Sequence, residues 1–265
     1  MADFKYTLGI DVGSTSSKCV VMEDGIKIAA KSLIAFGAGT SGPDRSIEMV
    51  LEKANLNIPE MCGILATGYG RKSVEIANWE MSELSCHAKG ANYLFPQART
   101  VIDIGGQDAK VLRIGGNGMM ENFVMNDKCA AGTGRFLDVM ARILELDVSE
   151  LEGLGNQSKE FLTISSTCTV FAESEVISQL SAGRDRRDVI AGIHRSVASR
   201  VAGLVRRMGV VPQVVMTGGV SQNGGVLKAL EDELEIEIKT SPLAPYAGAL
   251  GAALFAYDKA KRGRS

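Results

Sequence analysis

Residues 8–21 read LGIDVGSTSSKCVV, and residues 101–114 read VIDIGGQDAKVLRI. Both stretches run in the same order: an apolar run, an Asp, an apolar residue, a Gly, small or polar residues, a Lys and a second apolar run. A strand-like run that meets glycine and then returns predicts a β-hairpin. The copies begin about 90 residues apart, farther than the period of a solenoid repeat. The sequence therefore predicts an α/β protein of two related lobes with a cleft between them.

A third turn of this kind lies in residues 214–223, VVMTGGVSQN. It predicts a strand, a Gly218-Gly219 turn and a helix that begins near Gln222. Apolar residues at helical spacing predict two further helices, with the stripes Phe136, Val139, Met140, Ile143 and Ile190, Ile193, Val197, Val201, Leu204. No Pro- or Ser-rich linker separates the halves. We expect a first lobe over residues 1–97 and a second lobe over residues 98–245.

Composition narrows the class of protein. The 265 residues carry 29 Lys and Arg against 31 Asp and Glu, a net charge of -2, whereas a nucleic-acid surface normally needs a basic excess. No apolar run reaches the roughly 18–20 residues that cross a bilayer. The N-terminus has no signal-peptide pattern, so we expect a cytoplasmic protein with neither nucleic acid nor membrane as a partner. The 5 cysteines are scattered without a CxxC pair, which argues against a disulfide framework.

The first hairpin turn is rich in groups that bind phosphate. Backbone N–H groups converge in such a turn, glycine permits close approach, and hydroxyl or ammonium groups add donors and charge. The candidates here are Gly13, Ser14, Thr15, Ser16 and Lys18. Asp11, at the end of the strand, is expected to hold Mg²⁺ through water, because Mg²⁺ keeps much of its hydration.

The second hairpin supplies a matching set. Gly105 and Gly106 are expected to close on the phosphates, and either Asp103 or Gln107 to orient the attacking water. Either Asp-x-Gly segment alone is as well explained by an ordinary turn. Two copies in one strand context, followed by the TGG turn, favour a nucleotide site. No GxxxxGK[ST] P-loop occurs, and the GxG fragments lack the setting of a dinucleotide fingerprint.

These three motifs resemble the two phosphate motifs and the adenosine motif of the acetate and sugar kinase/Hsp70/actin superfamily. The resemblance implies two ribonuclease-H-like lobes that hold ATP between them and couple closure to hydrolysis. It also assigns Gly218, Gly219 and Gln222 to nucleotide binding. Residues 246–254, YAGALGAAL, resemble the superfamily's connector helix, so a helix within residues 246–265 is expected to pack back on the first lobe.

Two cysteines stand in unusual segments. Cys129 lies in NDKCAAGTGRFLDVMA and Cys168 in SSTCTVFAESEVISQL, and both are expected just before a helix start. The positive end of a helix dipole and its free N–H groups stabilise a thiolate there. A [4Fe–4S] cluster needs four thiolates, and two copies of the chain would supply them. From the residues alone, buried unreactive thiols remain the more common alternative.

Both segments resemble the cluster-binding stretches of the 2-hydroxyacyl-CoA dehydratase activators, and the resemblance extends through IAGIHRSVASRV, MSELSCHA and ATGYGR. It implies a homodimer with one [4Fe–4S] cluster held by Cys129 and Cys168 of each chain. It also implies an ATPase that passes an electron from ferredoxin or flavodoxin to a dehydratase. A small-molecule kinase of the same fold is the alternative, but it gives no reason for the two cysteines.

The remaining candidates receive structural interpretations. Cys19 is expected on a returning strand, Cys62 beside a strand and Cys86 in a helix, all as packing thiols. His87 and His194 are expected to be packed, because neither has a metal-ligand partner one helical turn away. Glu173 and Glu175 are expected to face water rather than a partner.

Overall fold

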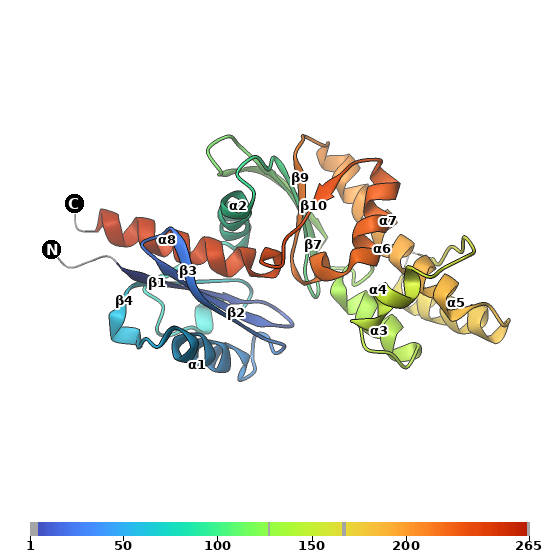
Figure 1. Cartoon of the computed structure of the whole chain (residues 1–265), viewed down its shortest axis with the longest axis horizontal. Helices are drawn as coiled ribbons and strands as arrows, with labels where there is room; N and C mark the ends of the chain where they lie inside the picture. Colours follow the sequence, from blue (N-terminus) through green and yellow to red (C-terminus); the bar gives the residue numbers. More distant parts are fainter. Residues whose placement is uncertain (1–4, 127, 166–167, 264–265) are drawn as a thin grey trace. The chain divides into compact units, whose positions relative to one another are not determined.

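The computed structural model describes residues 5–126, 128–165 and 168–263 (Figure 1). The chain forms two compact units. The first comprises Met1–Ala98, Ile114–Glu121 and Tyr246–Ser265, and the second comprises Arg99–Arg113 and Asn122–Pro245. The short piece Ile114–Glu121 joins the first unit, although it falls within the stretch that the sequence assigned to the second lobe.

The first unit is built on a sheet of five strands in the order β3-β2-β1-β4-β5. Neighbours β1, β2 and β3 pair antiparallel, whereas β1 with β4 and β4 with β5 pair parallel. The strands are β1 (Tyr6–Val12), β2 (Ser17–Glu23), β3 (Lys27–Ile34), β4 (Met61–Thr67) and β5 (Trp79–Glu80). The helices are α1 (Gly42–Ala54), α2 (Glu83–Leu94) and α8 (Ala247–Arg262), with short 3-10 turns η1 (Ile58–Glu60) and η2 (Arg71–Ser73).

The two faces of this sheet are covered by different helices, as Figure 1 shows for α1 and α8. Alternate β1 side chains, Leu8, Ile10 and Val12, share a core with Val50 of α1, as the period of two in a strand requires. Gly9 faces the opposite side, where a Cβ would stand 2.0 Å from the carbonyl oxygen of Ala249. Helix α8 therefore lies against the backbone of β1.

The second unit repeats this plan. Its sheet has the order β10-β9-β6-β7-β8, with β6 antiparallel to β7 and parallel to β9. The strands are β6 (Thr100–Ile104), β7 (Ala109–Ile114), β8 (Met120–Asn126), β9 (Val214–Thr217) and β10 (Ile238–Lys239). Read from β8 to β10, this order matches β3 to β5 of the first sheet. The duplication that the sequence predicted is thus present in the topology.

Among the described residues, five helices accompany this sheet. They are α3 (Gly134–Ile143), α4 (Glu150–Gly155), α5 (Thr169–Ser181), α6 (Arg186–Met208) and α7 (Gly224–Leu234), with η3 (Gly219–Gln222) and η4 (Ala244–Tyr246) as short 3-10 turns. Phe136, Met140, Ile193 and Val197, from the two predicted stripes, are buried in one core with alternate side chains of β6 and β9. Asp185 caps α6 by accepting from the N–H of Arg187 at 2.8 Å, which starts the longest helix described.

Both expected hairpins are present, and they have the same register. Asp11 pairs with Lys18 across β1 and β2, and Asp103 pairs with Lys110 across β6 and β7. The third turn also follows β9 as predicted, although a 3-10 turn comes first and α7 begins at Gly224 rather than near Gln222. Within the described residues, no helix is both long enough and apolar enough to cross a membrane.

Candidate functional site

The turn between β1 and β2 is closed by the N–H of Gly13, which donates to the carbonyl of Ser16 at 3.0 Å. Residues 13–16 are half-buried. The hydroxyls of Ser14, Thr15 and Ser16 make no hydrogen bond with any other part of the chain that the structure describes. Lys18 likewise has no ion pair within the described ranges. The turn therefore presents hydroxyl and ammonium donors that remain available to an anionic ligand.

Two glycine-rich loops donate hydrogen bonds to the backbone of this turn and of the strand before it. Ala38 donates to the carbonyl of Gly13 at 2.9 Å, and Gly70 donates to the carbonyl of Val12 at 2.9 Å. A Cβ on Gly37 would stand 2.4 Å from the Gly13 oxygen, so only glycine permits this approach. Sequence reasoning missed this support. The available signals were the glycine clusters in AFGAGTSG and ATGYGR.

Asp11 is buried beside the turn, with 4% of its surface exposed. Its Oδ2 lies 3.9 Å from Nε2 of His87 on α2. A Cβ on Gly68 would stand 2.6 Å from Oδ1, and a Cβ on Gly248 would stand 2.6 Å from Oδ2. The carboxylate is therefore enclosed by two glycines and an imidazole. The sequence indicated Asp11 but gave His87 only a packing role and did not predict that it lies beside the carboxylate.

The second turn, between β6 and β7, is closed by Gly105 donating to the carbonyl of Asp108 at 2.9 Å. Its own carbonyls accept from the start of α3: Gly134 donates to Gly105 at 2.9 Å and Arg135 donates to Gly106 at 2.7 Å. The first N–H groups of a helix have no acceptor inside the helix. The carbonyls of this turn supply those acceptors. The segment that follows Cys129 is therefore hydrogen-bonded directly to the second glycine turn.

Asp103 is held by contacts within its own unit. Its Oδ1 accepts from Oγ1 of Thr217 at 2.7 Å, and its Oδ2 lies 3.5 Å from Nζ of Lys110. The same ammonium lies 2.9 Å from Oδ2 of Asp108. All four side chains are buried. Lys110 thus neutralises the carboxylates of Asp103 and Asp108. Lys18, at the matching position of the first hairpin, forms no ion pair among the described residues.

Gln107 stands apart from this network. Its side chain is exposed at the tip of the turn, and no hydrogen bond joins it to another residue that the structure describes. Of the two groups expected to orient water, Asp103 has both oxygens engaged and Gln107 is accessible.

The third turn approaches the end of β6. Gly218 has φ +84, and a Cβ there would stand 2.3 Å from the carbonyl oxygen of Ile104. Gly219 has open space around its Cα. The amide of Gln222 donates to the carbonyl of Ser241 at 3.0 Å, so this side chain ties the turn to the loop after β10. The positive φ and the close approach to Ile104 thus require glycine at position 218. The space beside Gly219 is open.

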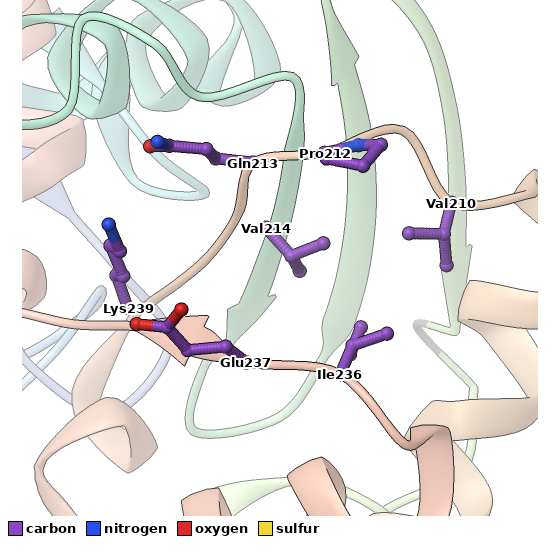
Figure 2. Close-up of a pocket in the computed structure, with 7 residues that line it drawn as sticks. All are labelled: Val210, Pro212, Gln213, Val214, Ile236, Glu237 and Lys239. Atoms are coloured by element: carbon purple, nitrogen blue, oxygen red, sulfur yellow. The ribbon is translucent and has the colours of Figure 1, made fainter.

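A cavity of about 280 Å³ lies at the end of β9 that is opposite the Gly218 turn (Figure 2). It is lined by Val210, Pro212, Gln213, Val214, Ile236, Glu237 and Lys239. Figure 2 shows the polar side chains at one end and the valine and isoleucine side chains at the other. Because Val214 starts β9 and Gly218 follows its end, the cavity is separate from the glycine turns.

The two candidate cluster cysteines are half-buried and belong to the second unit. Cys168 is the N-cap residue of α5, in extended backbone conformation, as expected. Cys129 differs from the expectation: residues 130–133 separate it from α3, whose N-cap is Thr133. The reason is local, because Ala130 accepts from both the N–H and the hydroxyl of Thr133 and closes a turn before the helix. The helix-start argument therefore holds for Cys168 but not for Cys129.

The other cysteines have different surroundings. Cys19 on β2 and Cys86 on α2 are buried, and burial raises the pKa of each thiol to about 12. Cys62 is half-buried within β4. These placements fit the packing roles expected for all three. Within the described ranges, no group of three or more His, Cys, Asp or Glu side chains is arranged to hold a metal ion.

Two other expectations have mixed outcomes. Glu175 was expected to face water, but its Oε2 accepts from the backbone N–H of Ser165 at 2.7 Å, so α5 is bonded to the segment that ends at Ser165. His194 is packed as expected. Burial, with a smaller effect from Arg195, lowers the pKa of His194 to about 4.

Residues 8–256 match the BadF/BadG/BcrA/BcrD ATPase family. The chain is 67% identical over 258 residues to the (R)-2-hydroxyglutaryl-CoA dehydratase activating ATPase of Acidaminococcus fermentans, which covers 97% of this chain and 99% of that protein. It is 52% identical over 257 residues to the activator of lactoyl-CoA dehydratase of Anaerotignum propionicum, covering 97% and 99%.

A solved structure of another dehydratase activator also matches this chain. The activator of the 2-hydroxyisocaproyl-CoA dehydratase from Clostridium difficile, with bound ADPNP, superposes with a TM-score of 0.95 at 52% identity. The match covers 98% of this chain and 97% of that chain.

Proposed function

The chain belongs to the BadF/BadG/BcrA/BcrD ATPase family, and on this premise we propose that it is the ATP-hydrolysing activator of a 2-hydroxyacyl-CoA dehydratase. In this proposal it passes a low-potential electron from ferredoxin or flavodoxin through a subunit-bridging [4Fe–4S] cluster. The observation that carries the proposal is the hydrogen bonding of the second glycine turn to the segment that follows Cys129. A phosphate-binding turn and a thiolate loop are thereby joined in one unit.

We assign nucleotide binding to the three glycine turns. Gly13, Ser14, Thr15, Ser16 and Lys18 bind phosphate in the first unit, and Gly105 and Gly106 in the second. Gly218, Gly219 and Gln222 form the adenosine side, where the open space at Gly219 lets the nucleoside approach the backbone. Support comes from the hydroxyls and the ammonium of the first turn, which have no other partner among the described residues.

Asp11 is the residue that we assign to Mg²⁺. Its buried carboxylate faces two glycines, which leaves space beside its oxygens that a Cβ would fill. Mg²⁺ keeps several waters and uses few carboxylates, which fits a single enclosed Asp. For the attacking water we favour Gln107 as the orienting group, with Asp103 shaping the turn, because Asp103 already accepts from Thr217.

Cys129 and Cys168 fit the cluster better than Cys19 and Cys86 do. Both are half-buried, whereas Cys19 and Cys86 are buried and their thiol pKa values are raised to about 12, which disfavours thiolate. Each chain brings two thiolates, and a [4Fe–4S] cluster takes four, so the proposed protein is a homodimer. When bound, the cluster supplies one-electron chemistry at low potential. The residues of the chain position its ligands and connect them to the nucleotide turn.

The proposed nucleotide turn and the proposed cluster ligand Cys129 are connected by a short series of hydrogen bonds. A change in the turn at Gly105 is transmitted to Gly134 and Arg135 through their hydrogen bonds, and from there to Cys129 through the Thr133–Ala130 turn. Hydrogen bonding and solvent exposure of the sulfurs are among the factors that set a cluster's potential. Hydrolysis would therefore reach the Cys129 ligand through this backbone path.

The partner is proposed as a class of enzyme. Relatives are named as activators of hydroxyglutaryl-, lactoyl- and hydroxyisocaproyl-CoA dehydratases. We propose a cytoplasmic location, because the buried thiols of Cys19 and Cys86 form no disulfide among the described residues, which suits a reducing compartment. A small-molecule kinase of the same fold finds no support, since these relatives are named as activators and two half-buried thiols serve no phosphoryl transfer.

The proposal is tested with protein purified without oxygen. Cys129→Ser and Cys168→Ser should each lose iron, whereas Cys62→Ser should retain it, because only the first two are ligands. Retention of iron by both ligand variants, or its loss in Cys62→Ser alone, overturns the assignment. Glucose, glycerol and acetate should not accelerate ADP release, and an acceleration would restore the kinase alternative.

A further inference from the structure

Helix α6 places Arg200 beside the loop that carries Cys129. Nη2 of Arg200 lies 3.8 Å from Sγ of Cys129, within hydrogen-bond range for sulfur. No carboxylate forms an ion pair with Arg200 among the described residues. By comparison, the Arg206 guanidinium lies 2.9 Å from Oε1 of Glu233, and Arg195 donates to the carbonyl of Leu162. The charge of Arg200 is therefore not neutralised by a neighbouring acid.

The Cys129 loop is shaped around the stem of this arginine. Gly132 has φ +85, and a Cβ there would stand 2.9 Å from Cγ of Arg200. On the other side of the loop, Nδ2 of Asn126 donates to the carbonyl of Cys129 at 2.9 Å. The loop is thus held between Asn126 and Arg200, with Gly132 where the loop backbone approaches the Arg200 side chain.

We propose that Arg200 is a positioning residue for the cluster: it donates to the sulfur of Cys129 and raises the reduction potential. This inference rests on the proposed function. Uptake of one electron from ferredoxin or flavodoxin adds one negative charge and no atom, and no bond is formed or broken. A cation beside a ligand sulfur stabilises the more negative, reduced state more than the oxidised state. Hydrogen bonds to the sulfurs and net charge are known determinants of such potentials.

Two features distinguish an effect of the Arg200 charge on the reduction potential from a structural effect of its side chain. A guanidinium is charged at every accessible pH, so its effect does not depend on a protonation step. The Arg200 side chain is also exposed in the single chain, so salt should weaken the effect because mobile ions screen exposed charges over about 8–10 Å at ordinary ionic strength. A purely structural role for the side chain would show no such dependence on salt.

The test compares Arg200→Gln, Arg200→Lys and the control Arg207→Gln in homodimer purified without oxygen. Arg207 is exposed on the same helix, and no contact joins it to a cysteine that the structure describes. Iron and sulfide are counted first, and the midpoint potential is then measured by dithionite titration at low and high salt. We expect Arg200→Gln to lower the equilibrium constant for reduction about threefold, or about 28 mV for one electron, with a smaller shift at high salt.

The outcomes separate the two proposals. Wild-type protein without iron overturns the proposed function itself, and this inference with it. Wild-type iron with equal potentials for Arg200→Gln and Arg207→Gln overturns only the role of Arg200. If Arg200→Gln loses its iron while Arg200→Lys keeps it, the charge is required and the inference stands. Equal loss of iron in both Arg200 variants shows that a positive charge at this position is not sufficient to keep the cluster and overturns the inference.

Discussion

The backbone N–H of Gly134 donates to the carbonyl of Gly105 at 2.9 Å, which joins the first residue of α3 to the second glycine turn. This bond connects a turn assigned to phosphate with the segment assigned to the cluster. A Cβ on Gly134 would stand 3.2 Å from the same oxygen, so alanine must push the two apart by a few tenths of an ångström.

Gly134→Ala should therefore weaken the communication between nucleotide and cluster. Without oxygen, an iron chelator should remove iron from wild-type protein at rates that differ between the ATP-bound and ADP-bound forms. We expect this difference to shrink in Gly134→Ala. Gly153→Ala is the matched control, because Gly153 lies in α4 with open space around it. An undiminished ratio of rates in Gly134→Ala would contradict the proposed path.

The two lysines of the repeated hairpins should differ in what they support. Lys18→Met should weaken ATP binding about tenfold or more, the effect of losing a charge-assisted hydrogen bond, with little change in stability. Lys110→Met should leave the buried carboxylates of Asp103 and Asp108 without their cation, at a cost of about 3–5 kcal/mol. ATP titration and urea unfolding of both variants measure these effects. Equal losses of stability would refute the division of roles.

Much of this arrangement could be predicted from the sequence. The two Asp–Gly–Lys segments indicated the hairpins because their spacing is local, and the registers of Asp11 with Lys18 and Asp103 with Lys110 follow from it. The stripes on α3 and α6 were readable for the same reason. The position of Cys129 was misjudged, because the turn closed by Thr133 delays the helix start.

Contacts between distant segments could not be predicted in this way. His87 meets Asp11 only because α2 lies beside β1, and Thr217 meets Asp103 only through the pairing of β6 with β9. Arg200 approaches Cys129 across 71 positions of the chain. Neither periodicity nor spacing specifies such pairs, since they depend on how complete elements pack.

Gly68 should be intolerant of a side chain for two separable reasons. Its φ is +86, and a Cβ would stand 2.6 Å from Oδ1 of Asp11. Gly39 has φ +76 but open space, so Gly39→Ala isolates the backbone strain, which costs about 1–2 kcal/mol. We expect Gly68→Ala to be less stable than Gly39→Ala and to lose Mg²⁺-dependent ATP hydrolysis. Normal hydrolysis by Gly68→Ala would argue against Asp11 as the Mg²⁺ group.

His194 should make the stability of the protein depend on pH. Burial lowers its pKa to about 4, below the ordinary 6.5, so the unfolded chain binds the proton more readily between these values. Its contribution is full above pH 6.5 and is lost as the pH falls towards 4, by up to about 3 kcal/mol.

His194→Leu should flatten this dependence. Urea unfolding of both proteins between pH 4.5 and 7.5 gives the difference, in which the carboxylates common to both cancel. The gap between the two free energies of unfolding should change with pH in that window. Parallel curves would show that His194 is not the group responsible.

The shared cluster is tested most directly by native mass spectrometry of protein purified without oxygen, together with iron and sulfide analysis. We predict a dimer of the 28.1 kDa chain that carries one cluster of four irons and four sulfides, since each chain supplies two thiolates. On exposure to oxygen, the cluster should be lost. A monomer that holds a complete cluster, or a dimer free of iron in both the ATP-bound and ADP-bound forms, would contradict the proposal.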